Sequence, residues 1–233
     1  MYRNARILSV VPARGGSKGI KLKNLREVGG VPLVGLAGDI SVHVPEIDKS
    51  VVSTDHDEIA RVAQLHGLSA PFRRPEHLSG DRIADLDVLT NALLEMESLD
   101  GVGYDYVVML QPTSPLRTVE NVSSAIQMCI DGGYDAVWTV SETDSKAHPL
   151  KQLTIKDNKL GYFDPKGAQI VARQELGKLY HRNGVAYVIS RSCLIDQKSI
   201  MGEKTGALLI DGPLISIDTE WDLALTNFIH SAK

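Results

Sequence analysis

The stretch Ile7-Leu-Ser-Val-Val-Pro-Ala-Arg-Gly-Gly-Ser-Lys-Gly-Ile20 predicts both the fold class and a ligand site. Its first part, Ile7–Val11, is a short run of apolar, mostly branched residues, as in a buried strand, and Pro12 ends the run. In open α/β folds, a loop that follows such a strand lies at the carboxyl edge of the sheet, where ligands bind. We therefore expect the glycine-rich loop at that edge.

The loop combines glycines with an excess of positive charge. Gly15, Gly16 and Gly19 lack a Cβ, so the backbone can adopt positive φ and bring its N–H groups close to a ligand. Seven basic residues precede the first acidic residue, and five of them follow Ala13 within one run: Arg14, Lys18, Lys21, Lys23 and Arg26. This combination favours a polyphosphate ligand. The alternative is an ordinary glycine-rich turn with solvated lysines.

Spacing excludes two common phosphate-binding loops. The chain has no Gly-x-x-x-x-Gly-Lys-Ser/Thr sequence, and no Gly-x-Gly-x-x-Gly follows the first strand. Neither a P-loop ATPase nor a dinucleotide-binding fold is therefore supported.

Length and composition indicate one large domain, 1–233, which is long enough to fold without disulfide bridges or a structural metal. The net charge of −4 argues against a nucleic-acid-binding surface, so the local basic excess indicates a site for a small anion. Cys129 and Cys193 lack metal-ligand spacing and are expected to be buried, reduced thiols, which fits a cytoplasmic protein. No apolar run approaches the ~20 residues that span a membrane, and no signal peptide is recognisable.

Short apolar runs alternate with longer amphipathic stretches. This pattern predicts an α/β fold with a mostly parallel, doubly wound (Rossmann-like) sheet. Strands are expected at 7–11, 50–53, 106–110, 136–140 and 185–189, and helices at 32–42, 57–66, 83–97, 119–131 and 221–230. The polar, turn-rich segment 142–182 interrupts the alternation and is expected to be an excursion from the sheet.

A second constellation is Leu110-Gln-Pro-Thr-Ser-Pro-Leu-Arg117, at the expected end of a strand. Its two prolines stiffen the turn and restrict the residues before them. Gln111, Thr113 and Ser114 are thereby held at the carboxyl edge, as neutral hydrogen-bonding groups suited to sugar hydroxyls. The alternative is a rigid strand-to-helix turn with Thr118 as the helix cap.

Two aspartates follow expected strands. Asp55 could contact a nucleotide or cap the helix that begins near Asp57, and capping is the favoured interpretation. Asp218 is expected at a strand end facing the phosphate loop, where one carboxylate suits Mg²⁺. A purely capping role is the alternative for Asp218.

The two neighbouring arginines, Arg73 and Arg74, begin a polar loop. One of them could bind a base or a phosphate, and a surface ion pair is the alternative.

Taken in order, the motifs resemble the acylneuraminate cytidylyltransferases, the CMP-sialic acid synthetases and their relatives. The resemblance covers nearly the whole chain. It rests on the segments 13–20, 23–25, 53–55, 74–75, 111–117, 148–151, 173–174, 183–187 and 218–223.

The resemblance implies CTP and a nine-carbon 2-keto sugar acid (a nonulosonate) as substrates, Mg²⁺ as cofactor, and CMP-sugar and pyrophosphate as products. Together with the residue patterns, it assigns catalysis to Arg14, Lys18, Lys23 and the metal ligand Asp218. Nucleotide binding is assigned to Ala13, Gly15, Gly16, Ser17, Asn24 and Arg74. Sugar binding is assigned to Gln111, Thr113, Ser114, Lys151, Arg173 and Tyr187.

Lys151 and Arg173 belong to segment 142–182, which in this family is a dimerisation subdomain that crosses to the partner subunit. The resemblance therefore also implies a homodimer.

One departure from the family pattern concerns the metal and sugar sites. Ser216 occupies a position where members acting on N-acetylneuraminate often carry Asp, and the Phe pair that some of them place before this motif is absent. Sialic acid, legionaminate, pseudaminate, a deaminated sialic acid and other nonulosonates all remain candidate substrates. An eight-carbon octulosonate is the alternative substrate, and a non-catalytic nucleotide-binding relative is the alternative function.

Overall fold

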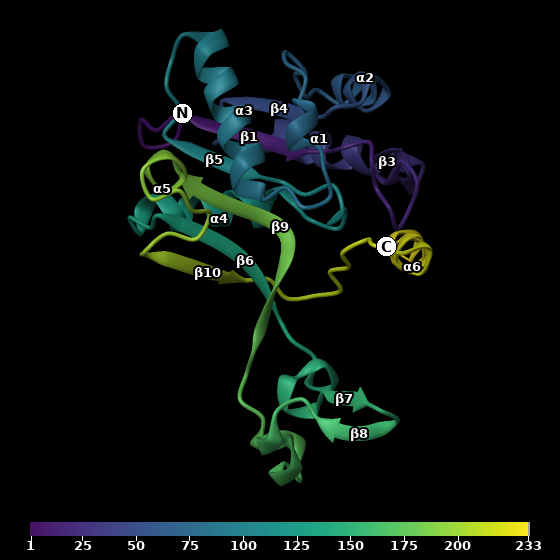
Figure 1. Cartoon of the computed structure of the whole chain (residues 1–233). Coiled ribbons are helices and arrows are strands. Elements are labelled where there is room, and N and C mark those ends of the chain that lie inside the picture. Colours follow the sequence, from purple (N-terminus) through teal and green to yellow (C-terminus); the bar gives the residue numbers. More distant parts are fainter. Residues whose placement is uncertain (233) are drawn as a thin grey trace.

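The computed structural model describes residues 1–232 and is built on a six-stranded sheet of order β10-β6-β9-β5-β1-β4 (Figure 1). β1 pairs in parallel with β4 and β5, and β10 pairs in parallel with β6. β9 runs antiparallel between β5 and β6, and the other five strands of this sheet share one direction. The predicted mostly parallel sheet is therefore confirmed. The strands are β1 (Ile7–Pro12), β4 (Lys49–Ser53), β5 (Tyr106–Met109), β6 (Ala136–Glu142), β9 (Tyr180–Ser190) and β10 (Thr205–Leu209).

Helices cover both faces of the sheet, because successive residues of each strand point to opposite sides. Ile7 and Val11 of β1 pack with α1 (Leu33–His43), α2 (Asp57–Leu65) and α4 (Val119–Asp131). Leu8 and Val10 pack on the other face with α3 (Asp85–Asp100) and α5 (Arg191–Ile195). The predicted doubly wound arrangement is confirmed.

The C-terminal helix α6 (Glu220–Ser231) lies outside these two layers. Leu223 of α6 packs with Val28 and Leu33 in a separate apolar cluster. This cluster joins α6 to the short hairpin β2 (Glu27–Val28) and β3 (Val31–Pro32).

α4 has the predicted bounds because the local sequence defines both of its ends. Thr118 accepts a hydrogen bond from the Asn121 N–H, and the Asn121 side chain accepts one from the Thr118 N–H, which completes a capping box. Gly132 follows the last turn, and Gly133 adopts a left-handed conformation with φ of 55°. A left-handed glycine of this kind commonly ends a helix.

The chain leaves the sheet after β6 and returns at β9, and the intervening residues 143–179, the excursion, project away from it (Figure 1). The excursion contains the hairpin β7 (Leu153–Lys156) and β8 (Lys159–Tyr162). Ile155 is 75% exposed and Val171 is 93% exposed, so the excursion buries little apolar surface within its own chain.

The remaining helical elements are short 3₁₀ turns: η1 (Lys23–Leu25), η2 (Glu76–Leu78), η3 (Ser145–Ala147), η4 (Pro149–Lys151), η5 (Pro165–Gln169) and η6 (Arg173–Glu175). Both cysteines are buried and free, as expected. None of the helices in residues 1–232 has the length and hydropathy that a membrane crossing requires.

Candidate active site

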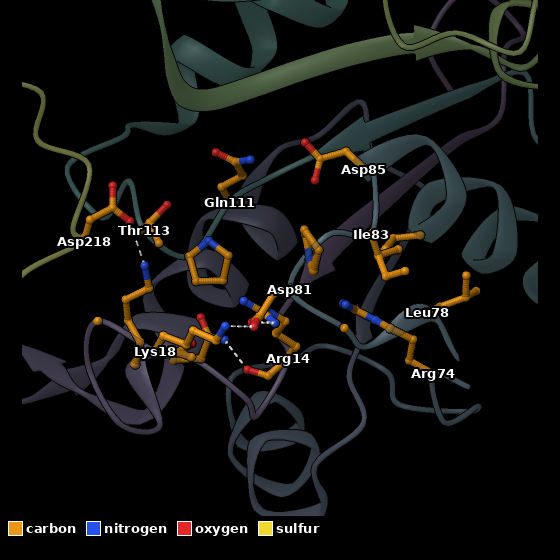
Figure 2. A pocket seen from close by; sticks show the side chains of 18 of the residues that line it. Arg14, Lys18, Arg74, Leu78, Asp81, Ile83, Asp85, Gln111, Thr113 and Asp218 are labelled. Carbon is orange, nitrogen blue, oxygen red and sulfur yellow. Dashed lines mark hydrogen bonds and ion pairs between the residues drawn. The ribbon is translucent and has the colours of Figure 1, made fainter. Parts of the chain in front are cut away.

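A cavity of about 610 Å³ opens at the carboxyl edge of β1 and β5. Its walls come from the loop after β1, the loop before α3, the loop after β5 and the segment before α6. Nine of the residues predicted for the site line it: Arg14, Ser17, Lys18, Lys23, Asn24, Arg74, Gln111, Thr113 and Asp218. Figure 2 shows how several of these side chains converge from different elements.

Two hydrogen bonds hold the loop after β1 in shape. Asn24 Nδ2 donates to the Arg14 carbonyl oxygen at 2.9 Å, and the Gly15 N–H donates to Asp55 Oδ1 at 2.8 Å. The prediction that Asp55 caps α2 is therefore wrong, since the capping position is His56. The parallel pairing of β1 with β4 places Pro12 opposite Ser53, which brings Asp55 against the loop.

The glycines of this loop provide close approach rather than a left-handed backbone. None of Gly15, Gly16 and Gly19 has φ between +20° and +160°, so the expectation of positive φ is wrong. A Cβ on Gly19 would lie 2.5 Å from the carbonyl oxygen of Asp218. Such a contact is far inside van der Waals distance, so only glycine lets the loop pack directly on the Asp218 segment.

Two carboxylates balance three basic side chains in the cavity. Lys23 Nζ donates to Asp218 Oδ1 and to the Ile217 carbonyl oxygen, both at 2.9 Å. Asp81 accepts from Arg14 Nη1 at 2.6 Å and also pairs with Lys18 (Figure 2). Hydrogen bonds from Lys18 and then Arg14 lower the pKa of the Asp81 carboxyl.

The Lys23 side chain is only 16% exposed, whereas that of Lys18 is 82% exposed. The Lys23 side chain is therefore held in place before a ligand binds, whereas the Lys18 side chain is largely in solvent.

Asp218 reaches this cluster from an unpaired segment. The prediction that it ends a strand is wrong, because β10 stops at Leu209 and no strand follows in residues 210–232. The capping alternative is also wrong, because Thr219 caps α6 together with Asp222. The segment is instead fixed by the Ile217 N–H, which donates to the Thr113 carbonyl oxygen at 2.8 Å.

Arg74 and Arg73 have different environments. Arg74 is 5% exposed, and its Nε donates to Ser53 Oγ at 3.0 Å. Burial lowers the pKa of the Arg74 guanidinium to about 10. Arg73 forms the surface ion pair that was the alternative, with Asp57. Of the two arginines, Arg74 lines the cavity.

Two cavity carboxylates, Asp81 and Asp85, were not predicted. Asp85 is the first residue of α3, and burial raises the pKa of its carboxyl. Asp81 lies in a loop without strand or helix periodicity, and Asp85 lies in the first turn of the expected helix 83–97, where acidic residues are common. The only sequence signal was the recurrence of acidic residues in the polar loop that follows Arg74.

Ser114 and Tyr187, predicted to bind sugar, lie beneath the cavity wall and are each 2% exposed. Ser114 Oγ donates to the Asn183 carbonyl oxygen at 2.7 Å, and the Tyr187 hydroxyl accepts from the Gly184 N–H at 3.0 Å. Ala13 is likewise fully buried, and its N–H donates to the Ser53 carbonyl oxygen at 2.9 Å. These side chains support the wall of the cavity in this structure and do not line it.

Lys151 and Arg173 lie in the excursion, away from the walls of this cavity. Arg173 lines a second cavity of about 370 Å³ at the base of the excursion, together with Glu142 and His148. Within one chain, the structure therefore does not bring these two residues together with Gln111.

Residues 8–205 match the family model described as cytidylyltransferase. The chain belongs to the cytidylyltransferase family. This cytidylyltransferase is 31% identical over 231 residues to the CMP-N,N'-diacetyllegionaminic acid synthase of Campylobacter jejuni, covering 98% of this chain and 97% of the relative. It is 28% identical over 229 residues to the pseudaminic acid cytidylyltransferase of the same species, covering 97% of each chain.

Among solved structures, the cytidylyltransferase resembles CMP:2-keto-3-deoxy-manno-octonic acid synthetase complexed with CTP. The TM-score is 0.70 at 18% identity, over 98% of this chain and 99% of the other. That likeness supports the Rossmann-like fold. The two sequence relatives support the predicted CMP-nonulosonate synthetase branch of the family.

Proposed function

We propose that this cytidylyltransferase transfers CMP from CTP to a nonulosonate and releases pyrophosphate. The observation that carries the proposal is the convergence of Arg14, Lys18 and Lys23 with Asp218 on one cavity at the sheet edge. The relatives are a legionaminic acid synthase and a pseudaminic acid cytidylyltransferase, which both act on nine-carbon acids. The identities of 31% and 28% are too similar to select one of the two acids, so the proposal names only the class of acid, a nonulosonate.

In the proposed reaction, the anomeric hydroxyl of the acid attacks the α-phosphorus of CTP. Lys18 and Lys23 bind the triphosphate, and Arg14 adds a third positive charge. Phosphoryl transfer depends mainly on positioning and on neutralising developing charge, which suits fixed cations better than a covalent intermediate. Gln111 and Thr113 line the same cavity and supply neutral groups for sugar hydroxyls.

The cavity also fits Mg²⁺ as cofactor. Mg²⁺ commonly takes one or two protein carboxylates and completes its octahedron with water and substrate phosphates. Asp218 is 72% exposed beside the basic cluster and offers one such carboxylate. Within residues 1–232 there is no group of three or more His, Cys, Asp or Glu that could bind a metal by itself. When bound with the triphosphate, Mg²⁺ would neutralise phosphate charge.

We further propose that the protein is a homodimer in which the excursion packs on the partner. Leu160 and Phe163 are 68% and 66% exposed on the excursion, beside the exposed Ile155. Apolar side chains at this density are typical of an interface. In such a dimer, Lys151 and Arg173 would reach the partner's sugar site. The two buried free thiols fit a cytoplasmic location.

Pyrophosphate release from CTP tests the proposal. The acceptor panel is N,N'-diacetyllegionaminate, pseudaminate, N-acetylneuraminate, its deaminated analogue and the eight-carbon octulosonate, with a reaction lacking any acceptor as control. We expect turnover with at least one nine-carbon acid and a product containing CMP. Turnover of the octulosonate alone would establish the eight-carbon alternative. CTP binding without any turnover would establish the non-catalytic alternative.

A further inference from the structure

The cavity has two chemically different ends. Arg14, Lys18 and Lys23 gather at one end beside Asp81 and Asp218. The other end is lined by the aliphatic side chains Leu78 and Ile83 together with Arg74 and Asp85, and Val88, one turn after Asp85 on α3, adds a third aliphatic side chain to the cavity. In Figure 2, Asp85, Ile83, Leu78 and Arg74 lie on one side of the cavity, and Lys18 and Asp218 lie on the other.

Asp85 is the cavity carboxylate that the phosphate end does not explain. Asp81 and Asp218 are paired with basic side chains, whereas the Asp85 carboxylate makes no hydrogen bond or ion pair with another residue of the described chain 1–232. Burial raises its pKa, and the charges of Arg182 and Arg74 partly offset that effect. A partly buried carboxylate without a protein donor keeps its full capacity to accept a hydrogen bond from a ligand.

The chemistry of this end suits a pyrimidine ring. With the triphosphate at the basic end, the base of the same nucleotide extends toward the aliphatic end. Aliphatic side chains can cover the faces of a flat ring, but they leave the hydroxyls of a sugar acid without partners. Cytosine carries an amino donor at N4, where uracil carries a carbonyl acceptor, and Asp and Glu accept from that amino group.

We infer that Asp85 is a specificity-determining residue that accepts a hydrogen bond from the cytosine N4 amino group and disfavours uracil at the same place. The inference rests on the proposed use of CTP and adds the residue that selects the base. A carboxylate facing the uracil carbonyl would pair two acceptors, so the same side chain favours one nucleotide and repels the other.

The first experiment compares CTP and UTP binding by calorimetry, without a sugar acid, in the wild type and in Asp85→Asn. An amide can accept from cytosine and can also donate to uracil. The preference for CTP should therefore fall by about 10-fold or more in Asp85→Asn. The control is Asp87→Asn, since Asp87 is exposed in the same first turn of α3 and does not line the cavity. Its preference should equal that of the wild type.

A second measurement needs no variant and remains valid if Asp85→Asn fails to fold. The triphosphate of 2-pyrimidinone riboside lacks the amino group, and the wild type should bind it about 10-fold more weakly than CTP. Equal binding of these two nucleotides by the wild type overturns the inference. So does a folded Asp85→Asn protein that keeps the wild-type CTP preference within about two-fold, or that changes only the KM for the sugar acid.

These outcomes are separable from the fate of the proposed function. A wild type that prefers CTP through Asp85 but turns over no acid would contradict the proposed function and leave the inference intact. Turnover of a nonulosonate by an Asp85→Asn enzyme with unchanged base preference would support the proposed function and contradict the inference about Asp85.

Discussion

Lys18 and Lys23 should respond differently to replacement by alanine, although both belong to the same basic loop. Lys23 is 16% exposed and donates to Asp218 and to the Ile217 carbonyl, so it is part of the folded framework before any ligand binds. Lys18 is 82% exposed, and Asp81 is its one ion-pair partner among residues 1–232. Lys23→Ala should therefore lower both stability and activity, whereas Lys18→Ala should lower activity alone.

The bond from Lys23 to the exposed Asp218 carboxylate contributes less than about 1 kcal/mol to stability, because solvent screens it. The bond to the partly buried Ile217 carbonyl adds about 1 kcal/mol. For a chain of this size, 1 kcal/mol corresponds to roughly 2–4 °C in Tm, so Lys23→Ala should lower Tm by roughly 2–8 °C. Lys18→Ala should stay within roughly 2 °C of the wild type, as is usual for exposed residues.

Both variants lose a charge-assisted contact with the triphosphate, worth about 1.5–3 kcal/mol, and more as charge develops on the leaving pyrophosphate. We expect kcat/KM for CTP to fall about 10²-fold in each. Thermal unfolding and pyrophosphate release measure the two effects separately. Equal Tm values for the two variants would refute the argument from burial. A folded Lys18→Ala enzyme with unchanged kinetics would refute the role of the loop in phosphate binding.

Three further predictions concern the charges of the site and the dimer. Asp218→Asn should remove most turnover and raise the Mg²⁺ concentration required, and full activity in EDTA would contradict this role. Asp81→Asn should tighten CTP binding about 2- to 10-fold by calorimetry, because it removes an internal competitor for Arg14 and Lys18, and weaker binding would mean that Asp81 instead orders them. Arg14→Ala and Arg173→Ala homodimers should each be nearly inactive. Co-refolding the two should restore about a quarter of wild-type activity, because half of the dimers then carry one intact crossed site. If the mixture stays inactive while heterodimers form, Arg173 serves its own subunit.

The sheet was predictable because each main strand carries its own apolar signal. The runs 7–11 and 136–140 lie within β1 and β6, and the capping residues of α4 define its bounds. The hairpins β2–β3 and β7–β8 were not predicted, because such short strands depend on partners supplied by the fold. β10 was not among the expected strands, because it begins at Thr205, before the apolar run at 208–210.

The site was predictable where residues directly follow the ends of parallel strands, as Arg14 and Gln111 do. It was not predictable where the position depends on contacts between distant segments. Asp55 precedes a helix and has the local pattern of a cap, but the pairing of β1 with β4 directs it to Gly15 instead. Asp81 faces Arg14 across a separation of 67 residues, which no local pattern reveals.

The segment Gln111–Arg117 combines two functions that its sequence alone does not separate. Gln111 and Thr113 line the cavity, whereas Arg117 is 4% exposed and donates Nη2 to the carbonyl oxygens of Gln111 and Gly184. Burial lowers the pKa of the Arg117 guanidinium to about 9, and no carboxylate within residues 1–232 pairs with it. Burying a guanidinium without a carboxylate partner costs free energy, so the burial of Arg117 persists only because other contacts require it. The Arg117 guanidinium fixes the backbone of Gln111 to β9 at Gly184, where φ is 71°. The same side chain therefore holds both the wall of the cavity and the strand that leads back from the excursion.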